Sequence, residues 1–254
     1  MNTLTVGFIG LGLIGGSIAK VLKKNRPDIY TIAYNRSEAP LKQALADGVI
    51  DKAGRIDEAF LECDFIFLGT PVEYNSVYLR KLIPFIKKGC IVTDVGSVKG
   101  YIHRTVSELG LEECFIGGHP MAGSEKTGYA NASDILLENA FYAITPTKAT
   151  TQDMLARYIE LVKLTGAIPV VLDPEHHDYS VAGISHVPHI IAASLVNLIK
   201  HSDDKNGTMK LLAAGGFKDI TRIASSSPEM WEQICTTNTD AIVKLLGDYI
   251  DYLT

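Results

Sequence analysis

The chain has 254 residues, 46% of them hydrophobic and 21% charged, with a formal net charge of −5 at pH 7. That composition is typical of a globular protein with a substantial core, and the lack of a basic excess argues against nucleic acid or an anionic membrane as partner. The four cysteines form no CxxC pair and none stands near two histidines at zinc-ligand spacing, so we expect reduced thiols and no metal site.

The apolar segments do not indicate targeting to a membrane. The N-terminus has no basic segment followed by a long apolar stretch, and we find no run of about 20 apolar residues. We therefore expect no export signal, no membrane span and a cytoplasmic location.

A glycine-rich turn close to the N-terminus indicates a dinucleotide site. An apolar run over residues 3–9 leads into Gly10-x-Gly12-x-x-Gly15, and the residues that follow, 13–24, have the apolar spacing of a helix. Gly10 allows the tight turn, Gly12 lets a pyrophosphate approach the backbone, and Gly15 lets the helix pack closely on the strand.

Two further places are expected to contact the cofactor. The N–H groups at the start of the first helix, around Leu13 and Ile14, should face the phosphates. Thr70 and Pro71 end a second buried strand, over residues 64–71, at the sheet edge where such cofactors bind.

The residues after the strand at 29–34 bear on the choice between NAD and NADP. An acidic residue usually follows this strand in NAD-specific sites, but here the residues are Asn35, Arg36 and Ser37. Arg36 and Ser37 can both bind a 2′-phosphate, which favours NADP, whereas Asn35 can still hydrogen-bond the ribose of NAD. Ser37 is also expected to cap a helix over residues 38–47.

Strand and helix patterns alternate through the first two thirds of the chain, which predicts a doubly wound parallel sheet of the Rossmann type. Ligands of such sheets bind beyond the carboxyl ends of the strands. The remaining elements expected in this part are a helix over residues 72–87, a strand over 90–94, a short strand over 114–116, and two strands, 141–144 and 168–171, around a helix over 151–164.

Two polar segments follow strands and are the places to look for chemistry. One covers residues 94–99 and carries Ser97, and the other covers 117–126 and carries His119. Since neighbouring strand ends meet at one edge, the serine is expected to lie near the histidine. The second segment also supplies a hydroxyl and a carboxylate, from Ser124 and Glu125.

From Asp173 onward the pattern is nearly all helical. We therefore divide the chain into a dinucleotide-binding domain, residues 1–172, and a helical domain for substrate binding and dimerisation, residues 173–254. Asp173 is expected to cap a long helix that begins with Pro174, and Pro188 should kink that helix or end it.

The last predicted helix opens at Ser227-Pro228 and carries a broad apolar face that runs to Ile250. A face of that width favours a buried dimer interface. The single tryptophan, Trp231, is assigned to the core or to this interface.

Several motifs together resemble the prephenate/arogenate dehydrogenase family of tyrosine biosynthesis. They are Gly10-x-Gly12-x-x-Gly15-Gly16-Ser17, Asp94-Val95-Gly96-Ser97-Val98-Lys99, Gly118-His119-Pro120-Met121-Ala122-Gly123-Ser124-Glu125, His177-Asp178, Ser185-His186-Val187-Pro188-His189 and Gly216-Phe217-Lys218-Asp219-x-Thr221-Arg222. The resemblance covers essentially the whole chain. It implies an NAD(P)-dependent oxidative decarboxylation of prephenate or arogenate by a homodimer.

Within that resemblance, His119 is the expected base or hydrogen-bond acceptor for the ring hydroxyl, because an imidazole titrates near neutral pH. Ser97 is expected to orient His119 or to bond the same hydroxyl. Arg222 is expected to bind a substrate carboxylate, and His186 to make a second contact. Ser124 and Glu125 are expected to shape the pocket. Lys99, Lys126 and Lys218 stay open between ligands and solvated lysines.

Asn35-Arg36-Ser37 departs from the family's frequent preference for NAD. Because the sequence stops at Thr254, we also expect no appended regulatory or chorismate mutase domain. The alternatives are another dehydrogenase of the β-hydroxyacid or pyrroline carboxylate reductase type, or a non-catalytic NAD(P)-binding sensor. The convergence of His119, Ser97 and Arg222 argues against the sensor.

Overall fold

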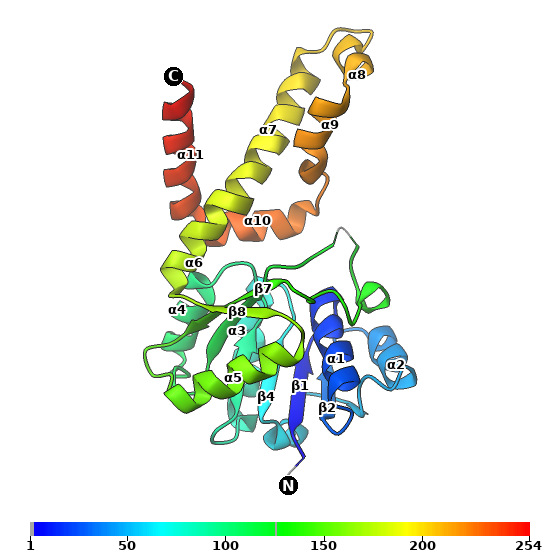
Figure 1. Cartoon of the computed structure of the whole chain (residues 1–254), viewed down its shortest axis with the longest axis vertical. Coiled ribbons are helices and arrows are strands. Elements are labelled where there is room, and N and C mark those ends of the chain that lie inside the picture. The colour runs from blue at the N-terminus through cyan, green and yellow to red at the C-terminus, as the bar shows by residue number, and fades with distance from the viewer. Residues whose placement is uncertain (1–2, 125) are drawn as a thin grey trace. The chain divides into compact units, whose positions relative to one another are not determined.

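The computed structural model describes residues 3–124 and 126–254, and it divides into two compact units, residues 1–177 and 178–254. The first unit is built around a parallel sheet of five strands in the order β3-β2-β1-β4-β5 (Figure 1). After β3 the chain crosses over to β4 on the other side of β1, so the topological switch lies between β1 and β4. The strands are β1 (Thr5–Ile9), β2 (Tyr30–Tyr34), β3 (Lys52–Ala53), β4 (Phe65–Leu68) and β5 (Ile91–Asp94).

Alternating side chains of the central strands build a core on each face of this sheet. On one face, Phe8 of β1 stacks on Phe67 of β4 with ring centroids 5.5 Å apart. On the other face, Ile9 and Ile66 join a second cluster. Helices α1 (Leu13–Asn25), α2 (Glu38–Ala46) and α5 (Gln152–Leu164) cover the first face, and α3 (Val72–Leu82) and α4 (Gly100–Glu108) cover the second.

A second sheet of three strands, in the order β6-β7-β8, differs from the sequence expectation. Its strands are β6 (Ile116–Pro120), β7 (Phe141–Pro146) and β8 (Ile168–Val171). β6 runs antiparallel to β7, and a single parallel bridge between Val92 and Phe115 links the start of β6 to β5. His119 therefore lies inside a strand, paired with Ala143, and not in a loop after the strand.

Short helical turns complete the first unit. They are η1 (Glu58–Glu62), η2 (Ile83–Phe85) and η3 (Tyr129–Asn131). The helix expected over 72–87 ends as α3 at Leu82, and η2 with Pro84 at its start follows it.

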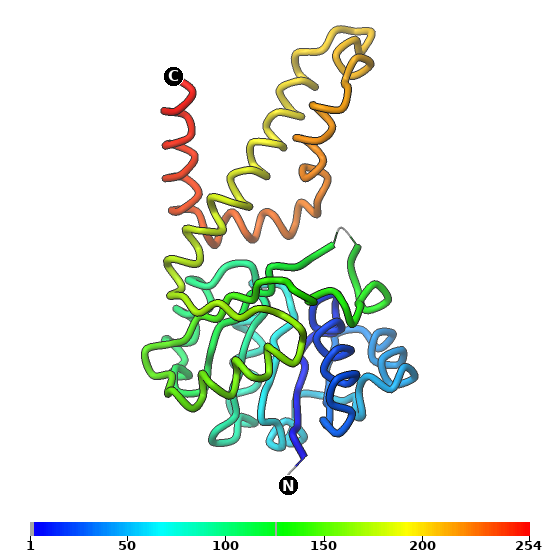
Figure 2. Tube along the Cα trace, in the orientation of Figure 1, coloured from blue at the N-terminus to red at the C-terminus, as the bar shows by residue number. Residues whose placement is uncertain are grey.

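The second unit is helical, and its chain runs along α7 and returns through α8 and α9 (Figure 2). Helix α6 (Pro174–Val181) begins as expected, since the Asp173 carboxylate accepts a hydrogen bond from the His176 N–H at 2.8 Å. The other elements are η4 (Ala182–His186), α7 (Val187–Ser202), α8 (Thr208–Leu212), α9 (Gly215–Thr221), η5 (Arg222–Ala224), α10 (Pro228–Thr237) and α11 (Thr239–Leu253).

The structure bears on two expectations for these helices. Of the two outcomes expected at Pro188, the helix does not end there: the five residues of η4 just before α7 adopt π-helical spacing, and the helical backbone continues into α7. A wider turn there accommodates a residue that has no N–H to donate. The single last helix is in fact two, α10 and α11, with Asn238 between them.

Among the described residues, the helical stretch Pro174–Ser202 is long and apolar enough to cross a membrane by length and composition alone. That property is weak evidence, because a long helix that packs against other helices meets the same criterion. The expectation of no membrane span therefore stays a prediction.

Candidate active site

The glycine turn after β1 has the geometry that a pyrophosphate needs. Gly10 adopts a φ of +98°, which favours glycine, and a Cβ on Gly15 would clash with the Gly10 carbonyl oxygen. A Cβ on Gly12 would meet nothing within 4 Å, so open space lies above the turn. Helix α1 starts directly after Gly12, with no side-chain cap and no acidic residue in its first turn, which holds Leu13 and Ile14. The turn therefore fits a dinucleotide phosphate.

Asn35 supports this turn from the end of β2. Its Oδ1 accepts a hydrogen bond from the Leu11 N–H at 3.0 Å, and its Nδ2 donates to the Ser37 hydroxyl at 3.1 Å. Ser37 occupies the N-cap position of α2 but makes no capping hydrogen bond, so that expectation was wrong. Arg36 and Ser37 are exposed, as residues that meet an incoming phosphate must be.

The end of β4 contributes a buried polar pair that sequence reasoning missed. The Thr70 hydroxyl donates to Asn75 Oδ1 at 2.6 Å, and Pro71 precedes α3 at the N-cap position. Asn75 is fully buried, yet its Nδ2 has no hydrogen-bond partner in the described part of the chain. A buried amide group left without an acceptor is costly in free energy.

His119 is held by a second histidine. Its Nδ1 lies 2.8 Å from Nε2 of His177, and the two rings meet edge to face with centroids 5.1 Å apart. His177 is 1% exposed, whereas His119 is half-buried. When Nδ1 of His119 donates to His177, its own Nε2 carries a lone pair and can accept a proton. The His177-Asp178 motif was the sequence signal for this partner, although sequence analysis gave it no role.

The other residues of the first unit that were expected in the site are Ser97, Ser124 and Glu125. Ser97 lies half-buried in the turn after β5 and makes no hydrogen bond to His119 among the described residues. Ser124 is exposed and its hydroxyl accepts from the Lys126 N–H at 3.2 Å. Glu125 lies outside the described residues.

In the second unit, Arg222 is exposed at the start of η5 and is the only arginine in residues 178–254. His186 is a buried residue of η4, with its Nδ1 3.2 Å from the Asn238 amide nitrogen. Because that amide nitrogen can only donate, His186 Nδ1 accepts. The bond gives His186 a structural role.

His189 stands out in the second unit and was not singled out from the sequence. Its ring stacks on Trp231 with centroids 3.5 Å apart and planes 5° from parallel. Burial lowers its pKa below the usual 6.5, and a hydrogen bond with the Ile223 backbone works in the opposite direction. Its Nδ1 and the Trp231 Nε1 are buried without hydrogen-bond partners in the described chain.

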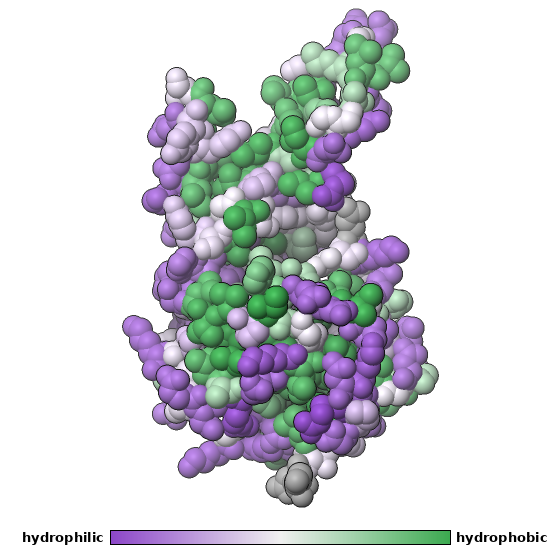
Figure 3. Space-filling model, viewed as in Figure 1, coloured by the Kyte–Doolittle hydropathy of each residue, from purple (hydrophilic) through white to green (hydrophobic). Residues whose placement is uncertain are grey.

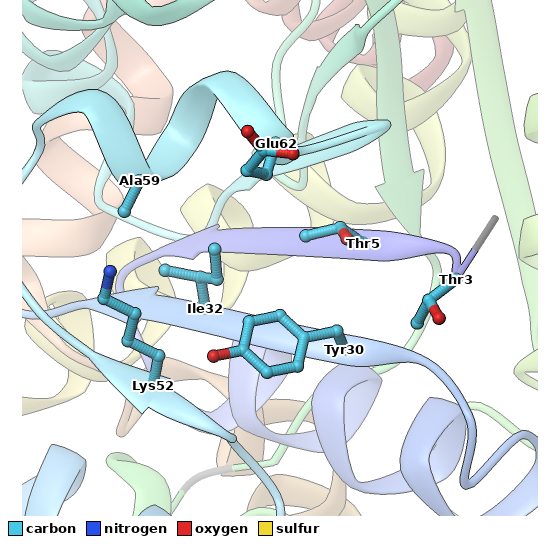
Figure 4. Close-up of a pocket in the computed structure, with 7 residues that line it drawn as sticks. All are labelled: Thr3, Thr5, Tyr30, Ile32, Lys52, Ala59 and Glu62. Atoms are coloured by element: carbon cyan, nitrogen blue, oxygen red, sulfur yellow. The ribbon is translucent and has the colours of Figure 1, made fainter.

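A pocket of about 380 Å³ lies elsewhere in the first unit (Figure 4). Thr5 and Tyr30, which begin β1 and β2, are among its lining residues, so it opens at the amino ends of the strands. The glycine turn is at the carboxyl ends, and parallel sheets bind their ligands there. This pocket is therefore separate from the dinucleotide site. The other lining residues are Thr3, Ile32, Lys52, Ala59 and Glu62.

Both parts of the chain match known protein families. Residues 18–171 match the nucleotide-binding domain of prephenate dehydrogenase, and residues 173–254 match its dimerisation domain. The first part is thus a nucleotide-binding domain, and the boundary between the matches lies at the start of α6.

Individual proteins similar to this chain are dehydrogenases of the same kind. The chain is 43% identical over 249 residues to the prephenate dehydrogenase of Bacillus subtilis, covering 97% of this chain and 67% of that protein. A crystal structure of prephenate dehydrogenase from A. aeolicus with hydroxyphenyl propionate and NAD+ is 32% identical, with a TM-score of 0.93, 100% of this chain and 89% of that chain covered. Synechocystis arogenate dehydrogenase is 34% identical, with a TM-score of 0.88 and coverage of 98% and 89%.

Proposed function

Because the chain belongs to the prephenate dehydrogenase family of enzymes, we propose that it oxidises and decarboxylates prephenate to 4-hydroxyphenylpyruvate, with NAD(P)+ as the oxidant. The observation that supports this most directly is the His119–His177 pair, which orients the His119 imidazole in the unit that binds the nucleotide. The family assignment also favours this reading over the β-hydroxyacid and sensor alternatives.

The chemistry needs a base for the ring hydroxyl. As the hydroxyl proton passes to Nε2 of His119, the O–H electron pair becomes the carbonyl bond. The imidazolium keeps its Nδ1–H on His177, so the positive charge forms beside a hydrogen-bond acceptor. The nicotinamide supplies the acceptor for the hydride of the ring carbon. Loss of carbon dioxide then gives a phenolate, to which His119 can return the proton.

Ser97 is proposed to bond the substrate hydroxyl rather than to orient His119, since His177 already does the latter. Arg222 is proposed to bind a substrate carboxylate, because its planar fork matches that group. His186 is hydrogen-bonded to Asn238, so we propose that it stabilises the second unit and does not bind the substrate directly. The proposal leaves Ser124 and Glu125 to shape the pocket.

For the cofactor, we propose a preference for NADP. NAD+ is bound in the A. aeolicus structure, and NAD and NADP have the same nicotinamide end. What differs is the ribose end, where Arg36 and Ser37 are exposed and no carboxylate repels a phosphate.

We also propose a homodimer through the helical domain, residues 173–254. The match to a dimerisation domain and the many exposed apolar side chains of this unit support it. The long apolar stretch Pro174–Ser202 is then covered by a second copy.

The test is reduction of NADP+ or NAD+ by the purified protein, followed through the absorbance of the reduced nicotinamide, with prephenate and with arogenate. Turnover with prephenate supports the proposal. Turnover with arogenate alone would favour the second candidate function, which the similarity to Synechocystis arogenate dehydrogenase makes worth testing. No reduction with either substrate would refute both.

A further inference from the structure

A lysine and an aspartate form a completely buried ion pair next to strand β6, the strand that carries His119. Lys99 is 0% and Asp94 is 1% exposed, and Lys99 Nζ lies 2.5 Å from Asp94 Oδ2. Burial of two charges costs several kcal/mol for each ion, and an apolar pair of similar size is often as stable. Stability alone therefore does not explain why these two residues are charged.

The pair connects the two segments that carry the reacting side chains. Lys99 Nζ also donates to the carbonyl of Gly118 at 2.5 Å, and Gly118 is the residue before His119. Asp94 ends β5, and its Oδ2 accepts from the Gly96 N–H at 2.9 Å. The turn that holds Ser97 thus begins at Asp94 and ends at Lys99, and the ion pair joins its two ends. The Lys99 ammonium also bonds strand β6 at Gly118.

Strand β6 has no room to move toward the buried hydroxyl groups of Tyr142 and Tyr158. A Cβ on Gly118 would lie 2.5 Å from the Tyr158 hydroxyl and 2.8 Å from the Tyr142 hydroxyl. These hydroxyls lie 3.0 Å apart, and Tyr158 is in turn 2.6 Å from the Thr93 hydroxyl. Polar groups at fixed hydrogen-bond distances, and not deformable apolar packing, therefore set where β6 passes.

We propose that Lys99 is a positioning residue, whose ammonium, held by Asp94, fixes the distance between the Ser97 turn and His119. It does not touch the reacting atoms. Its effect is on geometry, and misplacement of a reacting group by about 1 Å can cost about 10²-fold in rate. The inference rests on the proposed function, since it concerns the base and the hydroxyl assigned there.

Lys99→Met is the main variant. We expect kcat to fall about 10²-fold, while the dissociation constant of the reduced cofactor stays near that of the wild type. With prephenate deuterated at the ring carbon that bears the hydroxyl, the isotope effect on kcat should rise, because hydride transfer becomes slower than product release. Mere loss of folded protein lowers kcat but leaves the isotope effect unchanged.

A matched control exists in the same sheet. Lys87 and Asp64 form an ion pair at 2.9 Å whose side chains are 35% and 27% exposed, and Asp64 stands before β4 at the amino end of the sheet. Lys87→Met and Asp64→Asn make, at this partly exposed pair, the same changes as Lys99→Met and Asp94→Asn make at the buried pair. They should leave kcat per folded molecule and the isotope effect unchanged.

Asp94→Asn keeps the shape of the pair and decides the question if Lys99→Met does not fold. We expect a smaller loss of kcat, about 10-fold, with the same rise in the isotope effect. Wild-type kcat in a folded Lys99→Met or Asp94→Asn protein, or a loss that matches the unfolded fraction at an unchanged isotope effect, overturns the proposal. Failure of the proposed function would show earlier, as a wild type that does not oxidise prephenate.

Discussion

The two units differ in where their apolar side chains go. The first unit buries large side chains on both faces of its sheet, with Phe8, Phe67 and Tyr158 in the cluster on one face and Phe60 and Phe115 in the cluster on the other. In the second unit one cluster has only three buried members, Ala182, Val187 and Ile242. Large apolar side chains that stay exposed there include Leu198 (60%), Leu211 (80%), Leu212 (72%), Val243 (62%) and Tyr252 (91%). In the space-filling view, hydrophobic residues lie at the surface over α7 and α8 (Figure 3).

This difference indicates that the first unit is stabilised within one chain and that the second needs another surface. Exposed apolar area of this extent is unusual in a monomer. The division of labour follows: the first unit should govern cofactor choice and the base, and the second should govern assembly and substrate affinity.

The largest expected effect comes from charging the apolar face of the second unit. Val243→Glu with Ile250→Glu on α11 places two carboxylates where a second copy is proposed to pack. We expect the dissociation constant of the dimer to rise about 10³-fold, seen by light scattering over a dilution series. Val77→Glu on α3, at an exposed apolar position of the first unit, is the control and should stay dimeric. A wild type that is monomeric at micromolar concentration would refute the idea.

Arg222→Gln should raise the KM for prephenate about 10²-fold with little change in the KM for the cofactor, because a charge-assisted pair to a carboxylate is lost. Steady-state kinetics with each substrate varied measures this. Lys210→Gln, an exposed cation on α8, should change neither value. If Arg222→Gln changes only the melting temperature, the residue is structural.

A smaller effect is expected at the ribose end of the first unit. We expect kcat/KM to favour NADP+ over NAD+ about 10-fold, the worth of one modest charge-assisted contact. Asn35→Asp with Arg36→Ala should reverse the preference, since aspartate can still accept from the Leu11 N–H while it repels a phosphate. A wild type that prefers NAD+, or an unmoved ratio in the double variant, would show that Arg36 is only a solvated side chain.

The smallest effect concerns pH and His189. Its pKa in the folded protein lies below 6.5, so the unfolded chain binds the proton more tightly and stability is lost as the pH falls below about 6.5. We expect the melting temperature of the second unit to drop by a few degrees between pH 7.5 and 5.5, and less in His189→Asn. His201→Asn, an exposed histidine on the same helix, is the control. An identical pH dependence in wild type and His189→Asn would contradict the assignment.

Local sequence patterns predicted the features that depend on neighbours along the chain. The turn at Gly10 and the Asp173 cap are of this kind, and both are in place. Periodicity did not reveal the break at Asn238, because the apolar spacing of α10 continues into α11.

Features that join distant residues were missed. The pairing of β6 with β7 and the bond between His119 and His177, 58 residues apart, leave no local signal. Lys99 is the strongest example, because a lysine beside a polar turn reads as solvated until the fold closes around it. The residues of the site could therefore be proposed from sequence, but what holds them in place could not.

The most direct test of the central claim, that His119 is the base, is the rate of prephenate oxidation by His119→Asn. The account predicts that kcat falls about 10²–10⁴-fold while the cofactor binds normally in a fluorescence titration, because the amide cannot accept the proton. A folded His119→Asn protein that keeps more than about half of the wild-type kcat would contradict it.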